Sequence, residues 1–165
     1  MELLRRKLNR LADYDYSQNG AYFVTVCTRN RQKLLSDIVG DGFPVPTPIG
    51  LIAEEYIHKI PEKYPAVFVD RYVVMPDHIH ILLRIDTNPS GTGDPAPTIG
   101  NVIGWYKYQV TKQTNMQMNM SGVKLFQRSY YDHVIRNQQD YDEAWVYIEN
   151  NPRKWLLQRN GESSP

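Results

Sequence analysis

Two histidines separated by a single residue, His78 and His80, are the side chains whose types and spacing point most directly to chemistry. They belong to the segment 78–85, in which residues 79, 81, 83 and 85 are all apolar. Because side chains alternate between the faces of a β-strand, the apolar set faces a core and both imidazoles share the other face, within ~7 Å. Imidazole with oxygen ligands suits Mg²⁺, Mn²⁺ or Zn²⁺. A lone His-X-His pair occurs more often by chance than as a metal site, so a metal site here is a hypothesis.

A tyrosine and an asparagine near the end of the sequence form a second pair. Tyr147 and Asn151 lie four residues apart in a helical pattern and therefore share a helix face. Asn151 could offer its amide oxygen to a metal held by the two histidines, beside the phenol of Tyr147. A phenol of ordinary pKa, ~10, is a poor nucleophile, but a Lewis acid next to a phosphate lowers the barrier. From these residues alone the favoured interpretation is structural, with Tyr147 as core filler and Asn151 as a C-cap before Pro152.

Composition narrows the class of protein without selecting one. Of the 165 residues, 41% are hydrophobic and 22% charged, an average globular composition that excludes a fibre or a disordered tail. No apolar run approaches the ~18 residues of a membrane helix, so we expect no membrane partner. Cys27 is the single cysteine, which excludes an internal disulfide and a multi-thiolate zinc site and favours a cytoplasmic location.

Charge is distributed unevenly along the chain. The formal net charge is only +1, but the first 33 residues hold seven basic against three acidic side chains. The N-terminal cluster of Arg5, Arg6, Lys7 and Arg10 would neutralise DNA phosphates and make binding salt-dependent. Arg84 shares the histidine face of its strand and could also contact a phosphate. Short basic arms and single surface cations are often merely solvated, so both assignments are hypotheses.

The secondary-structure patterns alternate in an informative order. Expected strands cover 22–28, 67–74, 78–85 and 126–135, and expected helices cover 49–60, 98–113 and 140–150, the last broken near Pro152 with a helical tail to about 159. Residues 40–50 form a Pro/Gly-rich loop, 75–77 a hairpin turn and 87–97 a linker. This order predicts an α+β, ferredoxin-like fold, an antiparallel sheet with two helices on one face and a C-terminal helix carrying Tyr147.

We expect one domain over residues 1–165, with a basic N-terminal arm at 1–20 and a C-terminal tail at 152–165. The alternative is a different α+β arrangement in which the last strand pairs elsewhere.

Several ordered motifs, taken together, resemble the single-tyrosine HUH transposases, and among them the REP-associated tyrosine transposase family. The resemblance covers most of the chain and is more specific than His-X-His alone. Its segments are Arg5–Lys7, Tyr14–Gln18, Ala21–Thr25, Cys27–Thr28, Val74–His80, Phe126–Arg136 and Tyr147–Pro152.

The resemblance implies metal-dependent cleavage and transfer of single-stranded, hairpin-forming DNA. His78, His80 and Asn151 would hold Mg²⁺ or Mn²⁺ against the scissile phosphate, and Tyr147 would attack it to leave a 5′-phosphotyrosine link and a free 3′-hydroxyl. Related insertion-sequence transposases have glutamine where this chain has Asn151, so the shorter amide must come closer to the metal. The family is associated with palindromic hairpins and an adjacent guide tetranucleotide, which the basic N-terminal segment would read. A homodimer is expected only by analogy with the family. It stays open whether Tyr147 acts with the histidines of its own chain or with those of a partner chain.

Other residues compete for these roles. Tyr141 lies six residues before Tyr147, so on a helix the two side chains face about a third of a turn apart. Tyr130 and Tyr131 are in an expected strand. For His133 a hydrogen-bonded structural role is favoured. The remaining aromatic candidates are on the second expected helix, where Trp105, Tyr106 and Tyr108 could stack on bases although Tyr106 has core spacing.

Two functions of other classes stay open. One is a catalytically silent, domesticated protein that only binds hairpin DNA, although such a protein need not keep His78, His80 and Tyr147. The other is a metal-dependent hydrolase of small phosphoesters, which would need neither Tyr147 nor the basic N-terminus.

Overall fold

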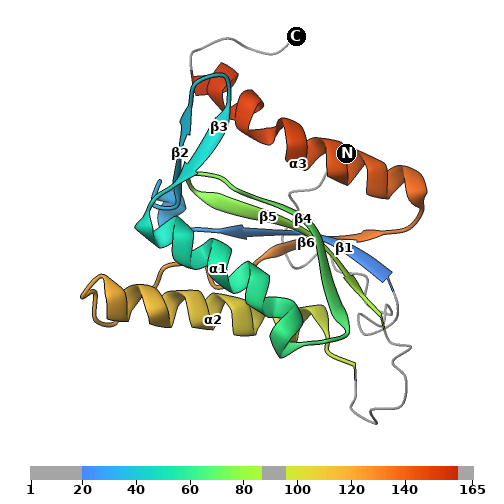
Figure 1. Cartoon of the computed structure of the whole chain (residues 1–165), viewed down its shortest axis with the longest axis horizontal. Helices are drawn as coiled ribbons and strands as arrows, with labels where there is room; N and C mark the ends of the chain where they lie inside the picture. Colours follow the sequence, from blue (N-terminus) through green and yellow to red (C-terminus); the bar gives the residue numbers. More distant parts are fainter. Residues whose placement is uncertain (1–19, 87–95, 160–165) are drawn as a thin grey trace.

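A four-stranded antiparallel sheet forms the framework of the protein, in the order β4-β5-β1-β6 (Figure 1). The computed structural model describes residues 20–86 and 96–159. The strands are β1 (Gly20–Cys27), β4 (Val67–Val74), β5 (His78–Ile85) and β6 (Tyr131–Ile135). Strands β4 and β5 form the predicted hairpin, closed where the Met75 amide donates to the His78 carbonyl at 2.8 Å. The order confirms the ferredoxin-like fold and excludes the alternative in which the last strand pairs elsewhere.

Two helices cover one face of this sheet. They are α1 (Pro48–Lys63) and α2 (Ile99–Gln117), and the Thr98 side chain caps α2 by accepting from the Asn101 amide at 3.1 Å. The main core lies between these helices and the sheet. From β5, residues Ile79, Ile81 and Leu83 enter it, as the alternation of the sequence predicts.

The third helix, α3 (Gln138–Arg159), crosses the opposite face of the sheet, as Figure 1 shows. Its Ala144 and Ile148 pack on Phe23 of β1 and Leu82 of β5 in a second, smaller core. The histidine face of β5 is therefore covered by a helix rather than open to solvent. This packing also explains why Pro152 does not break α3, contrary to the sequence prediction, since Trp155 and Leu156 beyond the proline continue the apolar contact.

A hairpin that the sequence analysis missed is inserted before α1. Strands β2 (Ser36–Val39) and β3 (Phe43–Pro46) form a separate two-stranded sheet, where residues 40–50 were expected to be a loop. Proline is tolerated in β3 because one edge of this strand pairs with no other strand, so an N–H group is not needed there. Gly42 at the tip has a φ of 118°, and a Cβ there would come within 2.9 Å of the Arg153 backbone. The hairpin therefore packs against the C-terminal part of α3.

Three other element ends differ from the sequence expectation. Pro61 does not stop α1, which runs to Lys63, because packing of the apolar face of the helix in the main core outweighs the one hydrogen bond that the proline removes. Helix α2 continues to Gln117 through a polar stretch without clear periodicity. Strand β6 begins at Tyr131 rather than 126, since Phe126 makes only an isolated bridge with Thr28.

Within residues 20–86 and 96–159, the structure contains no helix with the length and apolar character needed to span a bilayer.

Candidate active site

The two histidines occupy the face of β5 that α3 covers. His80 is completely buried and His78 is 7% exposed. Their ring centroids are 4.6 Å apart, well inside the ~7 Å that the strand spacing predicts. The sequence-based prediction that both imidazoles share one face is therefore confirmed.

His80 has one nitrogen fixed and the other without a partner. Its Nδ1 lies 2.8 Å from the Thr25 hydroxyl, which the β1–β5 register places directly opposite. Its Nε2 is buried and makes no hydrogen bond. Burial above all, followed by electrostatic interactions with His78 and Arg31, holds the pKa of His80 well below its usual range. The ring is therefore neutral near pH 7 and offers a nitrogen lone pair to a cation.

His78 is oriented by a carboxylate. Its Nδ1 lies 2.7 Å from Oδ1 of Asp77, whose Oδ2 accepts from Nε of Arg31 at 3.1 Å. Burial by itself would raise the pKa of Asp77, but the hydrogen bonds and charges of His78 and Arg31 outweigh it and lower that pKa. An ionised carboxylate only accepts, so the proton is on Nδ1 of His78. Nε2 is thereby directed into the site.

Helix α3 brings Asn151 and Tyr147 to the same place. Oδ1 of Asn151 lies 3.3 Å from Nε2 of His78, and the Tyr147 ring centroid is 5.4 Å from that of His80. Burial raises the pKa of Tyr147, while a hydrogen bond with Asn151 opposes the rise. Because α3 continues past both residues, Asn151 is not a C-cap, and the structural interpretation of that residue is wrong.

The four side chains predicted from the sequence thus converge on one small site from two elements. Comparison with known proteins assigns the chain to a family. The model of the family described as "Transposase IS200 like" matches residues 16–151.

The chain belongs to the IS200-like transposase family.

Its relatives agree with the predicted resemblance to REP-associated tyrosine transposases. An uncharacterised Haemophilus influenzae protein is 29% identical over an alignment that covers 91% of this chain and 89% of that protein. A second H. influenzae protein, described as a candidate REP-associated tyrosine transposase, is 26% identical over 85% of this chain and 74% of its own length. A solved structure of a REP-associated tyrosine transposase bound to a REP hairpin has a TM-score of 0.58 and 23% identity, over 88% of this chain and 74% of that chain. This last likeness supports the fold.

The residues that orient the two histidines could not be recognised from the sequence. Asp77 was read only as a turn residue, and no local pattern marks Thr25 or Arg31. Thr25 could be found only from the pairing of β1 with β5, which sets it opposite His80. Arg31 follows Asn30 in a tight turn where both have positive φ, 54° and 59°, and this turn directs its guanidinium back to Asp77.

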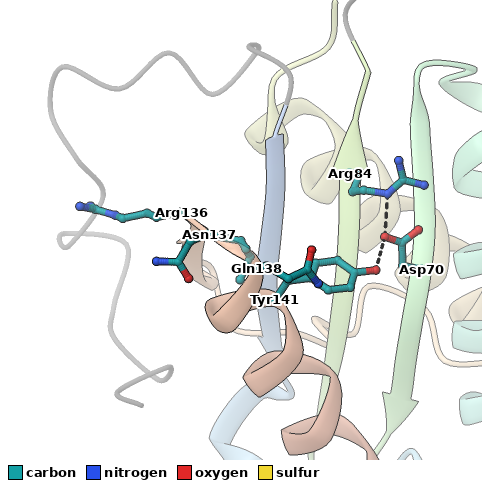
Figure 2. Close-up of a pocket in the computed structure, with 7 residues that line it drawn as sticks. Asp70, Arg84, Arg136, Asn137, Gln138 and Tyr141 are labelled. Carbon is teal, nitrogen blue, oxygen red and sulfur yellow. Dashed lines mark hydrogen bonds and ion pairs between the residues drawn. The ribbon is translucent and has the colours of Figure 1, made fainter.

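Tyr141, the rival nucleophile on α3, is held away from the histidines. Its hydroxyl donates to Oδ2 of Asp70 at 2.6 Å, and the same oxygen accepts from Nε of Arg84 at 2.7 Å. Figure 2 shows this arrangement in a pocket of about 490 Å³ at the start of α3. Partial burial and the Asp70 carboxylate raise the pKa of Tyr141 to about 12. A phenol so hard to ionise is a poor nucleophile.

The other competing residues have structural surroundings. Tyr130 is buried in the main core and Tyr131 is half-buried in β6. His133 has Nε2 3.2 Å from Oδ2 of Asp140 at the start of α3, which agrees with the hydrogen-bonded role favoured from the sequence. Arg84 is half-exposed and paired with Asp70, so its contact with DNA stays a prediction. The N-terminal cluster Arg5, Arg6, Lys7 and Arg10 lies outside the described residues.

Replacing Asp77 by asparagine tests the orientation of His78. Asparagine keeps the shape but removes the charge that fixes the proton on Nδ1, and loss of such a partner typically weakens metal binding by about 10- to 100-fold. We expect Asp77→Asn to weaken Mn²⁺ binding, measured by calorimetric titration, within that range. Asp37→Asn on exposed β2 is the charge-matched control and should bind as the unaltered protein does. Equal affinities for both variants would refute the orienting role.

Proposed function

We propose that this protein cleaves and rejoins single-stranded, hairpin-forming DNA of REP-like type through a covalent 5′-phosphotyrosine intermediate. The observation that carries the proposal is the fixed orientation of both histidines. Thr25 is hydrogen-bonded to Nδ1 of His80, and Asp77 is hydrogen-bonded to Nδ1 of His78. The Nε2 atoms of both rings are therefore directed toward the residues that α3 supplies. Membership of the IS200-like transposase family and the REP-associated relatives support the same activity.

The donor set fits Mg²⁺ or Mn²⁺ as cofactor. The buried Nε2 of His80 lacks a partner, and Nε2 of His78 and Oδ1 of Asn151 are two acceptors 3.3 Å apart. Ligands about 2.1 Å from one ion at near-octahedral angles are separated by roughly 3 Å, so this spacing suits a shared cation. Within the described residues no three His, Cys, Asp or Glu side chains gather as a metal site, so the third protein ligand would be the Asn151 amide. The ion would polarise the scissile phosphate and balance its charge.

The protein residues then carry out the nucleophilic step. The Tyr147 oxygen forms a bond to phosphorus as the bond from phosphorus to the 3′-oxygen breaks. The phenolic proton is lost, the leaving oxygen gains a proton, and the 5′-phosphate stays on Tyr147. Attack by a 3′-hydroxyl on this phosphotyrosine reverses the step and joins strands. Lys154, whose Nζ lies 5.8 Å from the centroid of the Tyr147 ring, supplies a nearby positive charge that would attract the phosphate.

The DNA partner is inferred from relatives. One solved relative is bound to a REP hairpin, and the basic residues Arg5, Arg6, Lys7 and Arg10 would contribute phosphate contacts next to such a hairpin. A cytoplasmic location, where this substrate occurs, remains an expectation.

The decisive experiment uses hairpin DNA with a single-stranded flank, labelled on the 3′ side of possible cleavage positions. Incubation with Mg²⁺ or Mn²⁺, followed by denaturing electrophoresis, should give a covalent protein–DNA adduct that EDTA prevents. Cleavage without an adduct would favour the phosphoester hydrolase, in which water is the nucleophile. Tight binding without cleavage under either metal would favour the silent hairpin-binding protein.

A further inference from the structure

A basic groove lies outside the histidine site, between the C-terminal half of α2 and the segment 124–128 that leads toward β6. It has a volume of about 590 Å³, and its lining includes the cations Arg29, Lys107, Lys124 and Arg128. None of the described residues that line it is acidic. Four positive charges on one concave surface without opposing carboxylates attract a polyanion.

The walls of the groove are fixed by hydrogen bonds. Nζ of Lys107 donates to the carbonyl oxygens of Gln127 and Arg128 at 2.7 and 2.9 Å, which ties the segment to α2. The amide of Arg29 donates to the Leu125 carbonyl at 2.9 Å, which ties the segment to the turn after β1. The side chains of Arg29, Lys124 and Arg128 are exposed above this rigid backbone. The groove is therefore a preformed cationic surface.

An exposed aromatic ring completes the groove. Tyr108 lines it and is 62% exposed, whereas Tyr106, two residues earlier on α2, is completely buried in the main core. A phenol ring held in the open beside cations is a platform on which a nucleic-acid base can stack. Stacking requires unpaired bases, so an aromatic ring among cations favours a single strand over a duplex.

The groove adjoins the histidine site around the end of the sheet. Cys27, the last residue of β1, pairs with His78, and the turn Arg29–Arg31 follows directly. Arg29 lines the groove, while Arg31 binds Asp77 beneath His78. One short turn therefore connects the two places, and Thr28, directly after β1, bridges Phe126, which also lines the groove. The histidines face α3 and the groove lies on the α2 side of the sheet, so a DNA strand bound at both places would pass around this turn.

We infer that this groove binds the backbone of a single-stranded DNA segment that flanks the cleaved bond, with Tyr108 stacked on one of its bases. The inference rests on the proposed function and extends it by assigning where the flank lies. Arg29, Lys124 and Arg128 contact its phosphates, and Lys107 keeps the segment 124–128 in position.

The test measures DNA binding separately from cleavage. All proteins carry Tyr147→Phe, and fluorescence anisotropy compares a hairpin bearing a single-stranded flank with the same hairpin without a flank. Lys124→Gln/Arg128→Gln should weaken binding of the flanked hairpin about tenfold and reduce the slope of log affinity against log salt by about 1.4, two phosphate contacts at ~0.7 each. Tyr108→Ala should weaken it about tenfold as well. Binding of the flankless hairpin should change less than about twofold in both.

Lys59→Gln/Lys63→Gln on α1 is the matched control, with the same change of net charge away from the groove, and circular dichroism checks the folding of each variant. Unchanged flanked-hairpin binding in the groove variants, or an equal loss in the control, overturns the inference. Equal losses for flanked and flankless hairpins overturn it in favour of a duplex-binding groove. If the protein with Tyr147 intact forms the adduct while the groove variants bind normally, only the groove assignment fails. If neither hairpin is bound and no adduct forms, the proposed function fails with it.

Discussion

Replacing Tyr147 by phenylalanine is expected to abolish the covalent protein–DNA adduct, lowering its rate of formation by at least about 10³-fold. The substitution removes only the oxygen that bonds to phosphorus. It keeps the ring that packs near Phe23 and His80, with centroids 5.7 and 5.4 Å away, so the site should keep its shape. Hairpin binding should therefore persist while the adduct band disappears from a denaturing gel.

Tyr141→Phe is the matched control for this result. It removes a phenolic oxygen from the same helix, but one held by Asp70 and with a pKa raised to about 12. Adduct formation in this variant should stay within a few-fold of the unaltered protein. Loss of the adduct in Tyr141→Phe with retention in Tyr147→Phe would reverse the assignment of the nucleophile. Retention in both would exclude a covalent role for either tyrosine.

His80→Gln is expected to weaken Mn²⁺ binding by at least about 100-fold and to suppress metal-dependent cleavage in proportion. The reason is the buried Nε2 of His80, which has no hydrogen-bond partner and is the donor best prepared for a cation. Calorimetric titration with Mn²⁺ measures the affinity without requiring any reaction. An affinity unchanged by His80→Gln would remove this residue from the metal site.

A double variant separates loss of the metal ligand from loss of the fold. Thr25 and His80 are buried hydrogen-bond partners, and His80 has a second, unsatisfied nitrogen. Replacing both by apolar residues, Thr25→Val/His80→Leu, removes the unsatisfied polar atom together with its partner. In denaturant unfolding of the metal-free protein this variant should be as stable as the original, or more stable by about 1 kcal/mol, while binding no Mn²⁺. Strong destabilisation would mean that the two polar residues maintain the fold.

Local patterns were sufficient for much of the framework. The alternation in 78–85 placed Ile79, Ile81 and Leu83 in the core and the histidines opposite, because a strand has a period of two whatever surrounds it. Helix patterns were less reliable at prolines. Pro61 and Pro152 both lie inside helices, since packing of the apolar face outweighs the single hydrogen bond that each proline removes.

The single cysteine and the His-X-His spacing already limited a metal to imidazole and oxygen ligands, and the family resemblance already selected Tyr147 and Asn151. The ligand types follow from composition and from residues close in sequence, and the resemblance follows from the order of several short motifs, so neither requires knowledge of the fold. Tertiary structure alone decided that Asn151 reaches His78 across 73 positions, that Thr25 and Asp77 fix the two Nδ1 atoms, and that Asp70 ties Tyr141 away from the histidines. Those contacts depend on strand register and on which face of the sheet α3 covers, and both are set by packing between distant segments.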